Sequence, residues 1–376
     1  MRIGFDAKRA FHNSRGLGNY SRTLLQGLSS YSSENKYFLY TPKPSVKLMH
    51  LFPENILKGF QIRFPKGFSW NIAPSLWRSF GLNAVIKHDK IDIFHGLSHE
   101  LPSNLIKINK TIKTVVTVHD LLVFRYPKFF TFIDRSIYRQ KLIHSCKNAD
   151  KIFAVSNQTS NDLQEFLKIP TNKISVLHQA CHPRFYQNNL RDLSKKDILH
   201  RYSLPLGPFI LMVGALEENK NHKSVIKALS YIKDKELTLV IIGQGRLKKE
   251  IFNEAKKRKI LNRLQLIPFV PSQDLPSIYQ LCKALVFPSF YEGFGLPIVE
   301  CLASGSAVVT SRGGCFAEAG GNEAFYADPN DPESIAEEIS RALKDHNAQE
   351  AKKHASQFNL QKTTKELLDL YQSVLS

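Results

Sequence analysis

The chain has 376 residues, 43% of them hydrophobic and 23% charged, which is the composition of a globular protein long enough for two domains of ordinary size. No apolar run approaches the ~18 residues needed to span a bilayer, and the opening Met-Arg-Ile-Gly-Phe-Asp predicts a strand rather than a signal peptide. The five cysteines are scattered without a CxxC pattern, which favours a cytoplasmic location and argues against a zinc site.

The net charge of +19 is concentrated in the first half of the chain. Residues 1–190 carry 27 basic and 11 acidic side chains, a net charge of +16, whereas residues 191–376 carry 25 and 22, a net charge of +3. A charge confined to one half predicts an anionic partner for that half. Nucleic acid, an anionic membrane surface and a phosphorylated acceptor all fit this description.

Short apolar runs separated by polar loops predict a parallel α/β sheet in the first half. The expected strands are residues 2–6, 37–40, 91–94, 114–118, 151–155 and 173–177. A polar loop is expected from Lys8 to Gly18, followed by a helix over 19–28. The Gly16-x-Gly18 pair resembles the start of a dinucleotide fingerprint, but Ser21 stands where the third glycine belongs. The pattern therefore argues against NAD binding.

Two stretches of the first half, residues 56–90 and 124–139, mix basic with aromatic side chains. Such a mixture suits a lipid headgroup interface, where rings lie at the boundary and bases meet phosphate. Helices packed on the sheet with basic outer faces are the alternative. If the membrane interpretation is correct, charge reversal of Lys58, Lys66 or Lys128 weakens retention by anionic vesicles.

The strand over 114–118 ends at His119, at the sheet edge where open α/β folds place their ligands. His119 is therefore a candidate site residue, and a hydrogen-bonded structural histidine is the alternative. After the strand over 151–155, the cap-type residues from Ser156 to Ser160 predict a helix start. The polar segment 187–202 is the expected linker, which places two domains at 1–187 and 203–358.

The second half restarts the same alternation of strands, loops and helices. Strands are expected over 209–213, 237–242, 264–270, 284–287 and 307–309, and helices over 298–304, 328–343 and 359–375. Glycine-containing loops follow three of these strands. They begin at Gly214, at Gly243 and, before the helix over 298–304, at Gly293.

Two carboxylates, Glu292 and Glu300, bracket the loop that contains Gly293 and Gly295. Glycines before a helix N-terminus let backbone N–H groups converge on an anion. Carboxylates accept paired hydrogen bonds, which suits the neighbouring hydroxyls of a sugar or ribose. In the alternative interpretation, Glu292 is a solvated loop acid and Glu300 an acid favoured by the helix dipole.

Residues 289–300, SFYEGFGLPIVE, resemble the Glu-x7-Glu signature of retaining glycosyltransferases with the GT-B fold, family 4. The resemblance implies an α/β fold of two Rossmann-like domains whose parallel sheets face each other across a cleft. In it, 1–187 binds the acceptor and 203–358 the nucleotide-sugar. The last helix, 359–376, packs back on the first domain.

The same resemblance implies a role for each matching residue. Glu292 faces the donor sugar, Glu300 binds the ribose, and Lys220 neutralises charge on the leaving diphosphate. His119 lines the acceptor side near the reacting carbon, so Glu292, His119 and Lys220 are the expected catalytic residues. Family members commonly carry an arginine near this lysine; Asn219 and Ala215 stand there, so Arg246 is a candidate substitute. The other implied donor contacts are Gly16, Gly18, Gly214, Gly243, Phe269, Val270, Gly293, Phe294, Gly295 and Leu296.

The resemblance further implies transfer of a hexose from GDP-mannose or a UDP-sugar to a saccharide acceptor with retained configuration. No Asp-x-Asp motif lies beside an expected strand end, so we expect no metal and no cofactor. The basic first half predicts a lipid-linked acceptor at the inner face of the plasma membrane, as in O-antigen or capsule synthesis. Nucleic acid would explain the charge but not the loop between Glu292 and Glu300, so we expect no nucleic-acid partner. The alternatives are a soluble-acceptor synthase of the sucrose or glycogen type, a nucleic-acid-binding Rossmann protein and a dehydrogenase.

Overall fold

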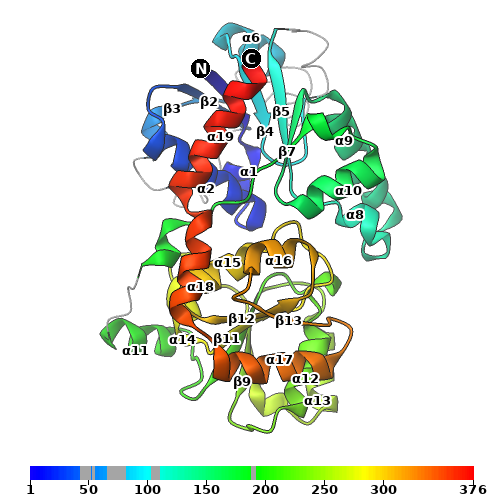
Figure 1. Cartoon of the computed structure of the whole chain (residues 1–376), viewed down its shortest axis with the longest axis vertical. Coiled ribbons are helices and arrows are strands. Elements are labelled where there is room, and N and C mark those ends of the chain that lie inside the picture. The colour runs from blue at the N-terminus through cyan, green and yellow to red at the C-terminus, as the bar shows by residue number, and fades with distance from the viewer. Residues whose placement is uncertain (43–51, 53–55, 66–81, 103–110, 188–191) are drawn as a thin grey trace. The chain divides into compact units, whose positions relative to one another are not determined.

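A computed structural model describes residues 1–42, 52, 56–65, 82–102, 111–187 and 192–376 (Figure 1). Its internal contacts divide the chain into two compact units. The first unit comprises Met1–Ala180 and Leu360–Ser376, and the second comprises Cys181–Asn359. Each unit is an α/β layer structure built on its own sheet.

The first unit contains a seven-stranded parallel sheet with the order β3-β2-β1-β4-β5-β6-β7. Its strands are β1 (Arg2–Asp6), β2 (Lys36–Tyr40), β3 (Phe60–Arg63), β4 (Ile93–Gly96), β5 (Lys113–Val118), β6 (Lys151–Ala154) and β7 (Ile174–Val176). Its α-helices are α1 (Lys8–His12), α2 (Gly16–Tyr31), α6 (Leu82–Asp89), α8 (Leu122–Arg125), α9 (Phe132–Asn148), α10 (Asn157–Leu167) and α19 (Leu360–Leu375).

Both faces of this sheet are buried, because successive side chains of a strand point to opposite faces. Ile93 and Val115 belong to the core cluster that also contains side chains of α2 and α19. The neighbouring Phe94 and Val116 belong to a second cluster, with side chains of α6, α9 and α10. Continuous apolar strands are therefore favoured, and this is why the sequence pattern located the strands of this sheet other than β3, which was not predicted.

The second unit contains a six-stranded parallel sheet with the order β10-β9-β8-β11-β12-β13. Its strands are β8 (Phe209–Val213), β9 (Thr238–Ile242), β10 (Leu264–Ile267), β11 (Ala284–Phe287), β12 (Ala307–Ser311) and β13 (Phe325–Ala327). Its α-helices are α11 (Asp192–Arg201), α12 (His222–Tyr231), α13 (Lys248–Lys257), α14 (Leu275–Leu281), α15 (Leu296–Ala303), α16 (Gly314–Gly320), α17 (Pro332–Asp345) and α18 (Ala348–Ala355).

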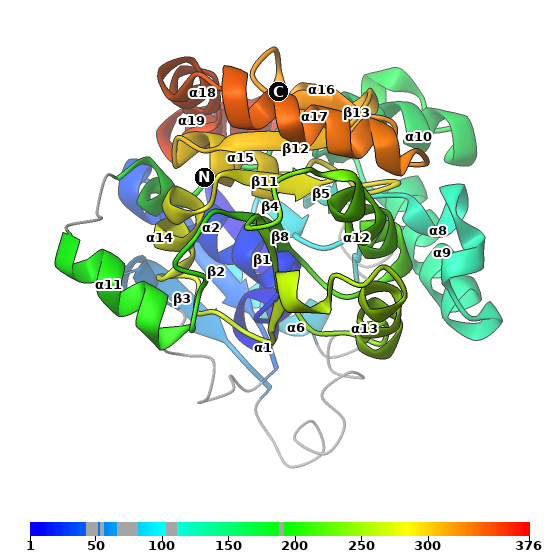
Figure 2. The ribbon, with the colours of Figure 1, turned by 90° about the horizontal axis from the view of Figure 1, so that it is seen from below.

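Helices α12, α13 and α17 contribute apolar side chains to one large core cluster with this sheet (Figure 2). Helix α15 packs against β11 and β12, and α14 packs against α15. In both units the sheet order reverses at the first strand, which is the doubly wound arrangement of Rossmann-like folds. The prediction of two such domains is confirmed.

Three local predictions were wrong. Residues 8–18 are not a loop: α1 forms there because Ala10 and Phe11 are buried against the sheet, and α2 already begins at Gly16. The segment 187–202 is not an open linker, because it contains α11, although residues 188–191 lie outside the described part. The first unit ends at Ala180 rather than at 187, and the second begins at Cys181 rather than at 203.

The last helix, α19, lies with the first unit and packs against α2. Its Tyr371 is fully buried, and the Tyr371 hydroxyl lies 2.6 Å from Nδ1 of His95 in β4. Nε2 of His95 lies 2.8 Å from the Thr117 hydroxyl, which in turn lies 3.1 Å from the Tyr20 hydroxyl. This buried chain of hydrogen bonds ties α19 to the middle of the sheet. Within the described residues, no helix is both long and apolar enough to cross a membrane.

Candidate active site

The sheet order of the second unit brings two loops together. Strands β8 and β11 are neighbours at the point where the order reverses, and ligands of open α/β sheets bind beyond the carboxyl ends of such strands. The loop after β8 carries Lys220, and the loop after β11 carries Glu292. The two residues are therefore placed at the topological switch point of this sheet.

Lys220 and Glu292 form an ion pair there. Nζ of Lys220 donates a hydrogen bond to Oε1 of Glu292 over 2.5 Å, and the two side chains retain 18% and 16% of their exposure. The lysine ammonium also lies 5.0 Å from the centre of the Phe287 ring, at the end of β11. A largely buried cation and a largely buried anion are thus in contact. Each keeps enough exposure for a charged ligand to take the place of its partner.

Asparagines hold these two loops against each other. The backbone N–H of Phe290 donates to the carbonyl of Asn219 over 2.8 Å. Nδ2 of Asn221 donates to the carbonyls of Pro288 and Pro329 over 3.1 and 2.7 Å. Asn221 has a left-handed backbone with φ 59°, a conformation that asparagine tolerates better than most residues. The position of Lys220 is therefore fixed on one side by the backbone carbonyl of Asn219 and on the other by the side-chain amide of Asn221.

Gly214 and Gly243 allow the loops after β8 and β9 to approach each other closely. A Cβ on Gly243 would lie 1.8 Å from the carbonyl oxygen of Gly214. A Cβ on Gly214 would be in ordinary contact with Cε of Lys220, 3.4 Å away, but the φ of +143° at Gly214 favours glycine. Gly214 and Gly243 were predicted to contact the donor, and that role stays a prediction. Independently of it, the local backbone and packing favour glycine at both positions.

Helix α15 starts at the same end of the sheet. Its N-cap residue, Gly295, has φ +102°, a conformation that favours glycine. Phe294 is buried and packs edge-on against Phe358, with ring centres 5.3 Å apart. Anchored in this way, Gly293 and Leu296 carry backbone amides at the positive end of the helix, where an anion is favoured.

Glu300 lies on α15, where its carboxylate Oε2 accepts a hydrogen bond from the Tyr279 hydroxyl over 3.1 Å. Burial raises the pKa of Glu300 to about 7, while Tyr279 and the Arg184 charge act in the opposite direction. Among the described residues, no hydrogen bond joins Glu300 to Glu292 or to Lys220. The two acids thus occupy different electrostatic environments.

The raised pKa of Glu300 predicts a pH dependence of donor binding. Ribose hydroxyls donate to a carboxylate, so affinity for a sugar nucleotide should rise as pH increases from about 6 to about 8 and Glu300 ionises. The diphosphate of a sugar nucleotide has no group that titrates there. Calorimetric Kd values over this range test the expectation, and Glu300→Gln should remove the dependence. A pH profile unchanged by Glu300→Gln would contradict it.

The raised pKa of Glu300 also makes the free energy of unfolding depend on pH, and this dependence has the opposite sign to that of donor affinity. The folded protein keeps the Glu300 proton at pH values where the unfolded chain has already lost it. The contribution of Glu300 to stability therefore falls as pH rises from about 4.5 to about 7. Where the two ranges overlap, between about pH 6 and pH 7, donor binding should tighten while the stability of the free protein falls.

Three residues near Glu300 and Lys220 were missed by the sequence analysis. Arg184 donates to the Ser272 hydroxyl over 3.0 Å and contributes positive charge at Glu300. His182 lies against Arg184, and burial lowers the pKa of His182 to about 3. His222, beside Lys220, is 2% exposed, and its Nδ1 has no hydrogen-bond partner among the residues that the structure describes. No local motif marks any of them, so only the tertiary fold reveals their position.

The remaining predicted donor residues of the second unit lie on the loops after β9 and β10. Arg246 is exposed in the turn before α13, and no hydrogen bond or ion pair joins it to another described residue. Phe269 is 62% exposed, whereas Val270 is buried. The structure therefore leaves Arg246 and Phe269 accessible, and their contact with a nucleotide stays a prediction.

In the first unit, His119 is buried, and both of its ring nitrogens are engaged. Nε2 lies 2.9 Å from the Leu97 carbonyl, to which it donates, and Nδ1 accepts from the Gln179 amide over 3.0 Å. The Tyr20 ring lies edge-on at 4.5 Å. Burial lowers the pKa of His119 to about 3, so the ring is neutral at pH 7. A direct contact between His119 and the substrate would require one of these hydrogen bonds to break.

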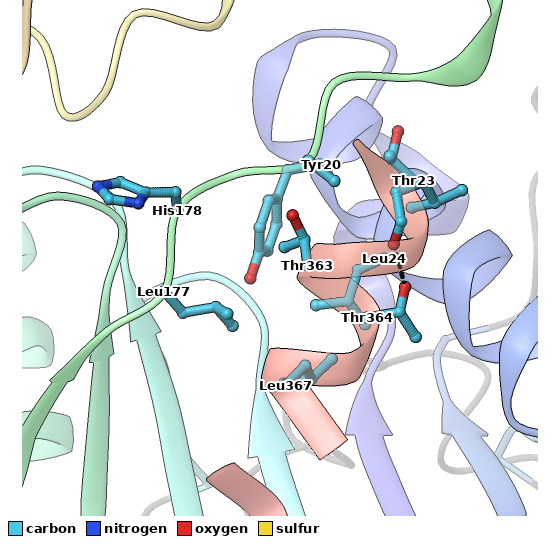
Figure 3. Close-up of a pocket in the computed structure, with 10 residues that line it drawn as sticks. Tyr20, Thr23, Leu24, Leu177, His178, Thr363, Thr364 and Leu367 are labelled. Carbon is cyan, nitrogen blue, oxygen red and sulfur yellow. Dashed lines mark hydrogen bonds between the residues drawn. The ribbon is translucent and has the colours of Figure 1, made fainter. Parts of the chain in front are cut away.

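Beside Tyr20 lies a small cavity lined by α2, α19 and residues 177–180 (Figure 3). Its volume of about 20 Å³ accommodates about one water molecule and no sugar.

Gly16 and Gly18, both predicted to line the site, differ in their surroundings. A Cβ on Gly18 would lie 1.8 Å from the Asn13 carbonyl oxygen, whereas a Cβ on Gly16 would meet nothing within 4 Å. We expect Gly18→Ala to lower the free energy of unfolding by about 1–3 kcal/mol. Gly16→Ala should leave it unchanged or raise it by up to about 1 kcal/mol. Urea titration of the two variants measures the difference, and equal stabilities would contradict the packing argument.

Two family models match the chain in succession. The model described as Glycosyltransferase Family 4 matches residues 14–184, and the model described as Glycosyl transferases group 1 matches residues 204–358. Together with the doubly wound fold of both units, these matches define the class: the protein is a glycosyltransferase with the GT-B fold. Within that class, the two successive matches support the family 4 type.

Known relatives agree with this assignment. The O-antigen chain mannosyltransferase B of Escherichia coli is 27% identical over 289 residues, which cover 74% of each chain. Among solved structures, HepE of Anabaena in complex with UDP and glucose has a TM-score of 0.77 at 17% identity, covering 99% of this chain and 100% of its own. Sucrose-phosphate synthase of Thermosynechococcus elongatus has a TM-score of 0.78 at 16% identity, covering 100% and 99%. At these identities the two structures show the shared fold alone.

Proposed function

We propose that this glycosyltransferase moves a hexose from a nucleotide-sugar to a saccharide acceptor, which is lipid-linked and belongs to surface polysaccharide synthesis. The observation that carries the proposal is the Lys220–Glu292 pair, because it places one cation and one anion at the switch point of the second sheet. A nucleotide-sugar offers the matching groups, a negatively charged diphosphate and a ring of hydroxyls.

Donor binding is then an exchange of partners. The diphosphate replaces Glu292 as the anion beside Lys220, with backbone amides at the start of α15 as additional donors. Glu292, released from the lysine, accepts hydrogen bonds from the sugar hydroxyls and fixes the orientation of the ring. Glu300 accepts from the ribose, on the same helix that presents the amides.

The proposed reaction retains the configuration at the anomeric carbon. The bond from that carbon to the diphosphate oxygen breaks, and the acceptor oxygen forms its new bond on the same face. The acceptor proton passes to a phosphate oxygen of the departing nucleoside diphosphate. Lys220 stabilises the negative charge that grows on the diphosphate, a contribution that is large in group-transfer reactions. We expect no divalent metal and no cofactor to be required, because Lys220 and the amides supply the charge stabilisation.

GDP-mannose is the first donor to test. The relative from Escherichia coli is named a mannosyltransferase, which supports mannose as the sugar. HepE was solved with UDP and glucose, which keeps UDP-sugars as the second choice. The same O-antigen relative supports a growing surface glycan as the acceptor, at the cytoplasmic face of the plasma membrane. A soluble-acceptor synthase is the second candidate, supported by the structural likeness to sucrose-phosphate synthase.

A thermal-shift screen of GDP- and UDP-sugars, followed by transfer assays, tests the proposal. We expect one sugar nucleotide to raise the melting temperature and its sugar to be transferred to a lipid-linked saccharide. Proton NMR of the product should show the anomeric configuration of the donor. Transfer to free sugars or sugar phosphates, with none to lipid-linked saccharides, would favour the soluble-acceptor synthase. Stabilisation by no sugar nucleotide would contradict the proposal.

A further inference from the structure

The sheet of the first unit has a topological switch point of its own. Its strand order reverses between β1 and β4, and open α/β sheets bind ligands beyond the carboxyl ends of their strands at such a point. The register pairs Asp6 of β1 with Gly96 of β4, and Gly96 with Val116 of β5. The carboxyl ends of these three strands are therefore neighbours at one edge of the sheet.

Arg9, His99 and His119 follow these three strands. Arg9 lies on α1, three residues after the end of β1, His99 lies three residues after the end of β4, and His119 directly follows β5. The backbone N–H of His119 donates to Nδ1 of His99 over 3.3 Å, and the centres of the two rings are 5.1 Å apart. Burial lowers the pKa of both histidines, and the Arg9 charge acts in the same direction, which indicates that the guanidinium lies near both rings.

His99 combines an unusual backbone conformation with an unused donor. Its φ of 60° is uncommon for a residue other than glycine, and such conformations concentrate at functional sites. His99 is 6% exposed, and burial lowers its pKa to about 4, so the ring is neutral at pH 7. Because Nδ1 accepts the N–H of His119, the neutral ring carries its proton on Nε2. Among the residues that the structure describes, no acceptor bonds to this Nε2–H.

Arg9 is half-buried, and its charge is also unpaired. Within the described ranges, no hydrogen bond, ion pair or cation–π contact involves the Arg9 side chain. The two acids whose charges reach the same rings are both engaged: Glu100 pairs with Lys141 over 3.3 Å, and Asp120 accepts a hydrogen bond from a backbone N–H over 3.0 Å. Burial disfavours an uncompensated charge, so an anionic ligand beside Arg9 would be stabilised.

Helix α1 holds the backbone of Arg9 in a fixed position. The buried Arg22 of α2 donates through Nη1 to the carbonyls of Ala10 and Asn13, over 2.8 Å in each case. Ala10 and Phe11 are themselves buried. The backbone that carries Arg9 is therefore preorganised, which lowers the ordering cost of binding a ligand.

We propose that Arg9 and His99 bind a phosphate group of the acceptor, next to the accepting sugar, at the switch point of the first sheet. The inference deepens the proposed function and rests on it for the saccharide acceptor. The guanidinium fork donates to two phosphate oxygens, and Nε2–H of His99 donates to a phosphate oxygen as well. A carboxylate offers fewer oxygens to these donors, and an uncharged saccharide leaves the Arg9 charge without a partner.

The same phosphate occurs in two kinds of acceptor. In a lipid-linked acceptor it joins the sugar to the lipid carrier, and in a free sugar phosphate it is the terminal group. In both cases the reaction that supplies the acceptor must join phosphate to the sugar that is glycosylated here. The transfer is therefore an early step, before a long glycan separates the accepting sugar from the phosphate.

Neither aromatic-basic stretch of the first half supplies Arg9 or His99. Most of the stretch over 56–90, Lys66 included, lies outside the described residues. The membrane interface predicted for this stretch and for 124–139 stays a prediction.

Acceptor preference tests the phosphate site in transfer assays. Mannose, glucose, galactose and N-acetylglucosamine are each offered as the octyl glycoside, the 1-phosphate and the polyprenyl diphosphate. For the accepted sugar, a phosphate-bearing form should have a kcat/KM at least about tenfold above that of the octyl glycoside, because hydrogen bonds to a charged group are strong. Arg9→Gln should lower this preference by about tenfold or more, mainly through the acceptor KM.

Three further variants make the test specific. Arg9→Lys keeps the charge but loses the fork, so it should retain part of the preference. His99→Asn tolerates the left-handed backbone but has a shorter side chain, and it should lower the preference by about threefold or more. Lys113→Gln, exposed at the opposite end of β5, is the matched control and should leave the preference unchanged. Thermal melting of each variant verifies folding.

A second measurement needs neither donor nor acceptor. In proton–nitrogen NMR spectra of the full chain with 15N-labelled arginine, the Nε–H signal of Arg9 is the one that Arg9→Gln removes. Millimolar inorganic phosphate should shift this signal, and chloride at the same ionic strength should not. A phosphate-induced shift in a chain that binds no sugar nucleotide would support the phosphate site while the donor assignment fails.

The acceptor panel also separates the two sources of phosphate. Transfer to polyprenyl diphosphates alone identifies the lipid-linked acceptor, and transfer to 1-phosphates alone identifies the free one. Three results would overturn the phosphate site: octyl glycosides used as well as the phosphate-bearing forms, a preference unchanged in Arg9→Gln, or an Arg9 signal that phosphate does not shift. A calorimetric loss of donor affinity in Arg9→Gln, with acceptor preference unchanged, would assign Arg9 to the donor instead.

Discussion

Replacing Glu292 with alanine is expected to lower kcat by about 100-fold or more while the Kd for the sugar nucleotide stays within about threefold of the wild-type value. The reason lies in the ion pair: Glu292 contacts Lys220 in the structure, and in the proposed complex it contacts the sugar hydroxyls instead and orients the ring. Removing the carboxylate leaves the lysine free for the diphosphate but leaves the sugar ring without its anchor. A reacting carbon displaced by about 1 Å can cost 100-fold in rate.

Single-turnover kinetics and calorimetry on the same preparation separate the two effects of Glu292→Ala. Glu292→Gln should be intermediate, because the amide still hydrogen-bonds to hydroxyls but no longer offers a charge. Glu337→Ala, an exposed acid on α17, is the matched control and should leave both quantities unchanged. Normal turnover by Glu292→Ala would refute the role assigned to this residue.

Replacing Lys220 with methionine is expected to reduce kcat/KM by about 100- to 1000-fold, the usual cost of removing one group that stabilises developing negative charge. Both kcat and donor affinity should fall, because the lysine meets the diphosphate before and during bond cleavage. Loss of the cation also leaves Glu292 as an unpaired anion beside an anionic ligand. Steady-state kinetics with the preferred donor measures the effect. Lys248→Met, at an exposed position on α13, serves as the control.

The double variant Lys220→Met/Glu292→Gln gives the sharpest form of this prediction. The two residues are in contact, so their effects should not add: part of the defect in Lys220→Met comes from the uncompensated Glu292 charge. Donor affinity in the double variant should therefore exceed that of Lys220→Met alone. Strictly additive losses would mean that the observed ion pair has no role in donor binding.

Much of the fold could be predicted because parallel strands buried on both faces have continuous apolar sequences. Strands β1, β8 and β11 were located to the residue for this reason. The elements missed were those with weak local signals. β13 has only three residues, and α1 lies in a polar sequence whose helical form depends on the burial of Ala10 and Phe11.

Only the part of the candidate site that lies within one short sequence motif could be predicted. Glu292, Gly295 and Glu300 lie within one short motif. The hydrogen bond from Lys220 to Glu292 spans 72 residues, so it could be recognised only once the order of the strands in the sheet was known. The hydrogen bond between Gln179 and Nδ1 of His119 spans 60 residues, and no local pattern contains that information. Arg184 reaches the surroundings of Glu300 from the segment that enters the second unit.

The central claim is that the Lys220–Glu292 site in the second unit binds the diphosphate of a sugar nucleotide. Isothermal titration calorimetry of GDP-mannose and of UDP-sugars, into the wild-type chain and into Lys220→Met, tests it most directly. The account predicts one-to-one binding of at least one of these donors to the wild-type chain and binding at least about tenfold weaker to Lys220→Met. Equal affinity in the two proteins, or no binding of any sugar nucleotide to the wild-type chain, would contradict it.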